Sequence, residues 1–157
     1  MKNSVLHDFL LQKSTAHKMG SWDAYVNAFK GDGTTMLKCG IYDQEGNPWA
    51  LSPGMSATQA QVKRLASHYE DSSDFYINGP EFESSKFAFL KKVEDGGNPV
   101  LVFKRKDAEN EEDKHLLVAM NTVQACLVGI AKGGEKHKSL AINLIRHVNE
   151  AMRKYNY

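Results

Sequence analysis

The sequence has none of the short motifs that mark common catalytic and nucleotide-binding sites. Its 157 residues contain no HExxH, no GxSxG, no GxxxxGKS/T and no GxGxxG. The six histidines are scattered without the spacing of metal ligands, and no two carboxylates are paired in a way that indicates acid–base catalysis. We therefore expect a protein that is not an enzyme and that uses no metal and no cofactor.

Charge excess, paired cysteines and long apolar runs are absent as well. Lys and Arg total 20 and Asp and Glu total 19, so the net charge of +1 provides no general attraction to nucleic acid. Cys39 and Cys126 stand alone, which is typical of free thiols in a reducing compartment. No apolar run approaches the roughly 20 residues of a membrane span, and the apolar cluster at residues 5–11 is too short for a secretory signal. We expect a cytoplasmic protein that does not bind nucleic acid.

Length and composition indicate one globular domain preceded by an extension. Hydrophobic residues make up 41% of the chain and charged residues 25%, which is usual for a single domain of this size. Residues 1–18 hold a short apolar cluster and a polar stretch, and a second methionine, Met19, follows them. We predict an extension over residues 1–18, with either one or two helical turns around residues 5–11 or no fixed structure, and a domain over residues 19–157.

Three segments have the periodicity of amphipathic helices. Ser21 is a suitable N-cap for a helix that runs to about Phe29 and is ended by two glycines. Thr58 can cap a second helix, whose apolar positions are Val62, Leu65, Ala66 and Tyr69. A last helix begins at about His137 after two glycines, and its apolar face consists of Ala141, Leu144, Ile145, Val148, Met152 and Tyr155.

The remaining regular segments have the pattern of strands joined by short turns. They cover residues 36–42, 49–51, 75–78, 86–93, 100–106, 115–123 and 124–131. The first two flank a loop of turn-forming residues and predict a hairpin, and residues 107–113 form an acidic, solvated loop. Short turns imply an antiparallel sheet, and helices at both ends of the domain imply an α+β fold.

The large aromatic residues predict either a core or a binding platform. Trp22 and Tyr25 share one helix face, Trp49 lies on an early strand, and Tyr157 follows the last helix. If the two terminal helices lie side by side, these rings can converge. Flat rings with N–H and O–H donors suit a polyproline II ligand, whose carbonyl groups point outward. Periodicity alone favours the other interpretation, in which Trp22 and Tyr25 simply fill a core.

Taken together, these residues resemble the profilin family and are most similar to animal profilins. The resemblance covers residues 20–157 in order, without large rearrangement. It is carried by Ser21-Trp22-x-x-Tyr25, Trp49-Ala50, Phe75-Tyr76-Ile77-Asn78-Gly79, Lys86, and the strand–Gly–Gly–His137–helix segment that ends in Tyr157. It implies a central antiparallel sheet with the N- and C-terminal helices packed together on one face and a further helix on the other.

The resemblance also implies partners and sites. It implies a monomer that binds monomeric actin and proline-rich proteins, and that contacts phosphoinositide lipids. The proline site would be Trp22, Tyr25, Trp49 and Tyr157. The actin surface would include Ile77, Lys86, Phe89, Lys91, Lys104, Lys106, His137 and Asn143, and the phosphoinositide contacts would be Lys86, Lys91, Lys104 and Arg105. Ala151 stands where the family usually has a histidine, and Tyr155 or His147 would have to compensate.

Several alternatives stay open at this point. Phe89 is either an apolar anchor of the actin surface or an inward-facing core residue, because the alternation of its strand is ambiguous. The lysines either attract a partner or form a solvated strand edge that prevents aggregation. Residues 1–18 are an unstructured leader, or they fold back through Leu6, Phe9 and Leu10 and compete with ligand for the aromatic residues.

The resemblance implies a regulator of actin polymerisation that links actin monomers to proline-rich partners and works in the cytoplasm on the cytoskeleton. One alternative is a proline-motif adaptor with weak or lost actin binding, because Ala88 and Asn143 depart from the family pattern. Another is a structural or trafficking α/β module in which the aromatic residues are ordinary core.

Overall fold

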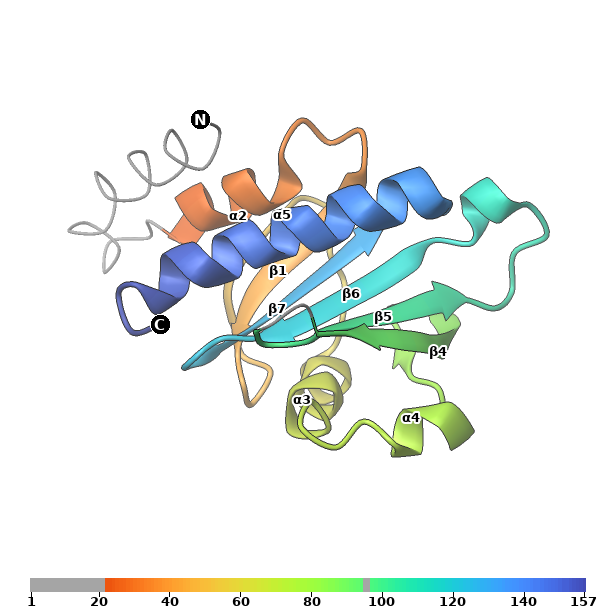
Figure 1. Cartoon of the computed structure of the whole chain (residues 1–157), viewed down its shortest axis with the longest axis horizontal. Helices are drawn as coiled ribbons and strands as arrows, with labels where there is room; N and C mark the ends of the chain where they lie inside the picture. Colours follow the sequence, from red (N-terminus) through yellow and green to blue (C-terminus); the bar gives the residue numbers. More distant parts are fainter. Residues whose placement is uncertain (1–21, 95–96) are drawn as a thin grey trace.

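In the computed structural model the described residues are 22–94 and 97–157, and they form an antiparallel sheet with helices on both faces (Figure 1). The extension predicted over residues 1–18 and the N-cap predicted at Ser21 lie outside the described residues. The α+β class predicted from the sequence is confirmed. No helix within the described part of the chain is both long and apolar enough to cross a membrane.

The sheet has seven strands in the order β2-β1-β7-β6-β5-β4-β3. The strands are β1 (Met36–Asp43), β2 (Pro48–Leu51), β3 (Glu81–Phe82), β4 (Ser85–Val93), β5 (Val100–Arg105), β6 (Leu116–Asn121) and β7 (Ala125–Ala131). Every neighbouring pair is antiparallel, and β1 and β2 form the predicted hairpin. All residues of β7 are buried, as a central strand covered on both faces requires.

Among the described residues, four α-helices cover the sheet, two on each face (Figure 1). They are α2 (Trp22–Lys30), α3 (Gln59–Ser67), α4 (Asp74–Ile77) and α5 (Glu135–Arg153). Helices α2 and α5 pack against each other on one face, and α3 and α4 lie on the opposite face. This arrangement confirms the predicted fold, in which the two terminal helices lie side by side.

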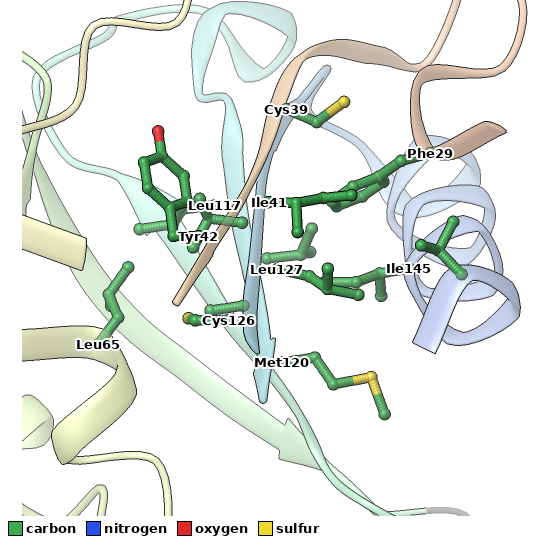
Figure 2. Close-up of a cluster of buried hydrophobic side chains, with 14 of the residues drawn as sticks. Phe29, Cys39, Ile41, Tyr42, Leu65, Leu117, Met120, Cys126, Leu127 and Ile145 are labelled. Atoms are coloured by element: carbon green, nitrogen blue, oxygen red, sulfur yellow. The ribbon is translucent and has the colours of Figure 1, made fainter. Parts of the chain in front are cut away.

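The core has one layer on each side of the sheet (Figure 2). Phe29 of α2 and Ile145 of α5 pack toward Leu127 on one side, and Leu65 of α3 lies on the other side. These side chains are at most 1% exposed, so the apolar stripes read from the sequence are the buried faces of the helices. Each such side chain contributes about 1.5–3 kcal/mol through burial.

Helix α3 begins with the cap that its sequence predicts. The Thr58 hydroxyl accepts a hydrogen bond from the Gln61 backbone N–H at 3.2 Å, and the Gln61 side chain accepts one from the Thr58 N–H at 3.1 Å. This capping box satisfies two backbone donors that a helix start leaves unpaired.

The strand predicted over residues 75–78 is wrong, because Asp74–Ile77 form the short helix α4. The Asp71 carboxylate accepts hydrogen bonds from the backbone and the side chain two residues later, at 3.2 and 2.7 Å, and so starts a turn locally. The Arg64 guanidinium lies 5.0 Å over the Phe75 ring and holds the helix against α3. The apolar run is therefore helical although it is too short to show a helical period.

The turn between β3 and β4 is tied to the rest of the fold by Glu83. Its carboxylate accepts a hydrogen bond from Lys38 Nζ at 2.6 Å and two from Ser56, at 2.8 and 3.0 Å. The Gln61 side chain bonds both the N–H and the C=O of Glu83, at 2.9 and 3.0 Å. These bonds hold Glu83 in a backbone conformation with φ of 54°, which few residues other than glycine adopt.

Candidate protein-interaction surfaces

Four aromatic side chains from separate parts of the chain meet beside α2. The Trp22 ring lies 5.4 Å from Tyr25, 4.6 Å from Trp49 and 4.9 Å from Tyr157, measured between ring centroids. The first contact lies within α2, the second reaches β2, and the third is an edge-to-face contact with the residue that ends the sequence. We call these four residues the aromatic platform. The sequence predicted that these rings would meet if α2 and α5 lay side by side.

Trp49 reaches the platform because β2 contains a β-bulge. Ala50 pairs with Ile41 and Pro48 pairs with Tyr42, so Trp49 is the extra residue between two regular pairs. In a regular strand Trp49 would point away from the face of Ala50, toward the side of α3. The bulge instead brings its ring onto the α2 side, which is a known use of bulges near functional sites.

The two interpretations of the aromatic residues each hold for part of the platform. Tyr25 is fully buried and is a core residue, whereas Trp22, Trp49 and Tyr157 are only partly buried. Burial raises the pKa of Tyr25 to about 12, with smaller contributions from Tyr155 and Tyr157. Its hydroxyl has no hydrogen-bond partner among the described residues. A neutral donor thus lies beneath three rings that retain exposed surface.

The residue that departs from the profilin pattern lies on the adjoining helix. Ala151 is 6% exposed, so its methyl group is enclosed on the inner side of α5. Tyr155, one of the two residues considered as a replacement, is close enough to Tyr25 to raise the pKa of that residue. Tyr155 therefore lies near Tyr25.

The predicted lysines gather on one face of the sheet, which we call the basic face: Lys86, Lys91, Lys104 and Lys106. Ala88 stands opposite Lys104 on β4 and β5, and the Lys106 N–H donates to the Lys86 carbonyl at 2.9 Å. Lys91 stands opposite Val102, two residues before Lys104. Cross-strand partners share a face and alternate residues return to it, so the four lysines lie together.

Glu135, at the start of α5, shows which side of the sheet this is. Its pKa is lowered first by a hydrogen bond from Lys138 and further by the charges of Lys91 and Lys104. The basic face therefore lies on the side of α5. His137 and Asn143 of α5 are half-buried and exposed, respectively, and His137 Nδ1 is bonded to the Thr35 hydroxyl at 2.9 Å.

Two other predicted residues lie on the opposite side of the sheet. Arg105 stands opposite Phe87, and its Nε donates to Asp107 at 2.6 Å, so it is separated from the lysines of the basic face. Phe89 stands opposite Phe103 with ring centroids 5.1 Å apart. A bulge between Phe89 and Lys91 reverses the alternation of β4, so these two residues lie on different faces.

An exposed apolar ledge on α4 continues from Phe89. Tyr76 and Ile77 are 68% and 83% exposed, and the Tyr76 ring lies 4.7 Å from that of Phe89. The sequence reasoning selected Ile77 and missed Tyr76. Tyr76 was missed because the strand predicted over residues 75–78 would turn one of two consecutive residues inward, whereas the helical turn exposes both.

The acidic loop predicted over residues 107–113 folds back on the basic face. Glu111 accepts a hydrogen bond from Lys104 Nζ at 2.9 Å and lies 3.7 Å from Lys114 Nζ, and these lysines lower the pKa of Glu111. The backbone of this loop packs closely on Gly133, where an added Cβ would lie 2.3 Å from the Glu111 carbonyl oxygen. One carboxylate thus already neutralises part of the basic face.

Solved profilin structures resemble this fold closely. Mouse profilin IIa, in complex with a double repeat from the FH1 domain of mDia1, matches with a TM-score of 0.69 at 16% identity, over 87% of this chain and 99% of that chain. Acanthamoeba castellanii profilin IA matches with a TM-score of 0.66 at 19% identity, over 87% and 99%. LokiProfilin1, in complex with rabbit actin, matches with a TM-score of 0.57 at 9% identity, over 82% and 91%.

At the level of sequence, no curated protein matches the chain significantly. The family model described as Profilin matches residues 20–157, a range that includes all of the described residues. The same range carries the aromatic platform and the basic face. The chain therefore belongs to the profilin family.

Proposed function

We propose that this protein binds actin monomers, regulates actin polymerisation and links actin to proline-rich partners in the cytoplasm, without enzymatic activity. The observation that carries the proposal is the convergence of three aromatic side chains on Trp22, at 4.6 to 5.4 Å. A core needs no such cluster with exposed faces, whereas a proline-rich ligand does. The family membership and the complexes of related folds support the same function.

A polyproline II segment would lie across the exposed faces of Trp22, Trp49 and Tyr157. Its prolines stack on flat rings at little entropic cost because the ligand is already extended. Its carbonyl groups need donors, which the indole N–H groups and the tyrosine hydroxyls supply. The mouse profilin IIa complex contains such a ligand class, an FH1 repeat, which supports this assignment.

The actin surface would combine the basic face with the adjoining part of α5. Lysines at a rim steer an acidic partner and tune specificity. Ile77 is exposed on α4, which contacts β4 from the other side of the sheet, so it would add burial only for a partner that reaches around the β4 edge. Such a protein would hold one actin subunit in an exchangeable complex and deliver it where a proline-rich partner recruits the platform. The LokiProfilin1–actin complex supports actin as the partner of this fold.

Phosphoinositide sensitivity is the weaker part of the proposal. Lys86, Lys91 and Lys104 lie on one face and would attract an anionic headgroup. Arg105 lies on the opposite face and would not join them. We expect a lipid of this class to compete with actin rather than with proline-rich ligands.

The decisive experiment is a titration of the full chain with a proline-only peptide, followed by intrinsic tryptophan fluorescence. Both tryptophans lie in the platform, so we expect a saturable change in emission. The absence of any change would contradict the proline site. Repeating the titration without residues 1–18 then tests whether that segment competes with the peptide.

A second titration tests the actin site and separates the main proposal from the adaptor alternative. We expect Lys86→Glu to weaken actin binding while the peptide titration stays the same. A protein that binds the peptide and fails to bind actin monomers in a fluorescence or sedimentation assay would be a proline-motif adaptor.

A further inference from the structure

The turn between β6 and β7 holds the residue that completes the aromatic platform. The Thr122 hydroxyl donates to the main-chain oxygen of Tyr157 at 2.5 Å, and the Gln124 backbone N–H donates to the same oxygen at 2.6 Å. The Gln124 side chain donates to the Asn156 carbonyl at 2.6 Å. Three hydrogen bonds from one turn therefore fix the last two residues.

The surroundings of Thr122 hold its hydroxyl group in place for this contact. It is 4% exposed, and its Oγ1 accepts a hydrogen bond from the Ala125 N–H at 2.9 Å. That bond fixes the position of the hydroxyl oxygen. Its proton can reach the Tyr157 oxygen at 2.5 Å and the Ala125 carbonyl at 3.4 Å, and the shorter distance favours Tyr157. The hydroxyl thus both accepts and donates, and an apolar side chain of the same shape would leave the Ala125 N–H without this partner and the Tyr157 oxygen with the Gln124 N–H alone.

The same turn is tied to the hairpin that carries Trp49. Gln44, in the loop between β1 and β2, donates through Nε2 to the carbonyls of Thr122 and Ala125, at 3.1 and 3.3 Å. One turn thus contacts both segments that bring rings to Trp22 from outside α2. The rings meet Trp22 at 4.6 Å for Trp49 and 4.9 Å for Tyr157.

The chain turns sharply after α5, so the position of Tyr157 depends on hydrogen bonds from other segments. Asn156 has a φ of 64°, so the backbone reverses direction directly before Tyr157. Asn tolerates this conformation better than most residues, but it still requires support from its surroundings. The Tyr157 N–H returns to the Met152 carbonyl at 3.0 Å, and the turn holds the oxygen on the other side.

We infer that Thr122 is a positioning residue for proline-rich ligands: its hydroxyl latches the Tyr157 backbone and so sets the Tyr157 ring edge-on against Trp22. The inference rests on the proposed proline-binding function. Thr122 does not contact the ligand. Its effect is to keep the Tyr157 ring in place before binding, so that its ordering costs no free energy when the ligand arrives.

The test compares Thr122→Val, which removes the hydroxyl at nearly constant shape, with Thr122→Ser, which keeps it. For Thr122→Val we expect the affinity for a proline-only peptide to fall about fivefold, the ratio that corresponds to one hydrogen bond of ordinary net strength. Thr122→Ser should restore it to within about twofold. Val123→Ala, at a 53% exposed position of the same turn, is the matched control and should leave the affinity unchanged.

Two readouts separate positioning from loss of structure. Actin affinity should be equal in all variants, and the Tyr157 ring resonances in an NMR spectrum should shift in Thr122→Val alone. Equal losses of actin and peptide binding would show a general structural defect and overturn the inference. So would unchanged Tyr157 resonances in Thr122→Val. If the unaltered protein binds no peptide, the proposed function fails, and the NMR comparison still decides whether the latch exists.

Discussion

The aromatic platform and the basic face are built in opposite ways. The platform brings three rings from α2, β2 and the end of the chain within about 5 Å of Trp22, and Tyr25 is completely buried. The basic face takes its lysines from β4, β5 and the residue after β5, and they share a face through strand pairing and the bulge after Phe89. The first is a product of tertiary packing, and the second is a product of local pairing.

This difference determines what limits binding at each surface. The platform offers geometry, so its affinity depends on how firmly the rings are held and changes little with salt. The basic face offers charge, so its affinity depends on ionic strength, with a screening length of about 8 Å at physiological salt. Each surface can therefore be altered without the other.

Helix α5 joins the two surfaces and keeps them apart. His137 lies in its first turn, and Tyr157 follows its end at Arg153. A helix of 19 residues spans about 28 Å at a rise of 1.5 Å per residue. On the proposed function, a proline-rich ligand and an actin monomer would be bound at opposite ends of this one helix.

The substitution with the largest expected effect is Trp22→Ala, which should impair the aromatic platform and leave the basic face intact. Trp22 is the only ring that contacts all three other members of the platform. We expect its loss to lower the affinity for a proline-only peptide by at least about 50-fold, the range of a binding hot spot. Trp49 remains in this variant, so the peptide titration can still be followed by tryptophan fluorescence. Actin affinity should be unchanged, and a parallel loss of actin affinity would contradict the separation of the two surfaces.

A charge reversal on β5 tests the basic face in the same way. Lys104→Glu should weaken actin binding on the order of tenfold at low salt and less at high salt. Arg105→Glu is the matched control, because the next residue along the strand lies on the opposite face. We expect it to change actin affinity less than about twofold. Equal effects in an actin titration would show that the face of the sheet does not matter.

Much of the fold could be predicted because it depends on local sequence patterns. The cap at Thr58 and the apolar stripe of α5 depend on residues within a few positions of one another. The cap appears as predicted, and the stripe is buried at Ala141, Ile145, Val148 and Met152, whereas Leu144 is half-buried and Tyr155 lies beyond the helix. The resemblance to profilins supplied the rest of the topology. The convergence of the platform followed once the two terminal helices were placed side by side.

The errors arose where single residues change the register. The sequence left the facing of Phe89 open, because alternation alone does not locate a bulge, and it grouped Arg105 with Lys104 although consecutive residues of a strand face opposite sides. One bulge after Phe89 and another at Trp49 decide which face each neighbour takes, and neither bulge has a glycine to mark it. The latch on Tyr157 also escaped prediction, because its hydrogen bonds cross 35 positions of the sequence.

A substitution at Glu83, in the turn between β3 and β4, should lower the stability of the fold without changing binding at either surface. Burial by itself raises the pKa of Glu83, but hydrogen bonds from Lys38 and Ser56 outweigh it and lower the pKa below its ordinary value of 4.5. The ionised form is thus favoured in the folded state, so its contribution to stability is complete above pH 4.5 and is lost as the pH falls through the lower folded pKa.

Glu83→Gln should lower the free energy of unfolding at pH 7 by about 1–2 kcal/mol, the cost of breaking a charged hydrogen bond that is partly buried. The difference between the two proteins should shrink below pH 4.5. Urea unfolding at several pH values measures this. Peptide and actin affinities should stay equal at pH 7. A constant difference at every pH would show that the ionised carboxylate is not the source.

The smallest expected effect concerns the acidic loop. It tests more closely whether charge determines the actin affinity of the basic face. Glu111 competes with an acidic partner for Lys104, so Glu111→Gln should raise actin affinity about twofold at low salt, the scale of an exposed ion pair. Glu112→Gln removes an equal charge from the same loop without touching that pair and should give a smaller gain. If both variants gain equally, the loop acts through its total charge. If the gain persists at high salt, it arises from altered packing on Gly133 rather than from the released lysine.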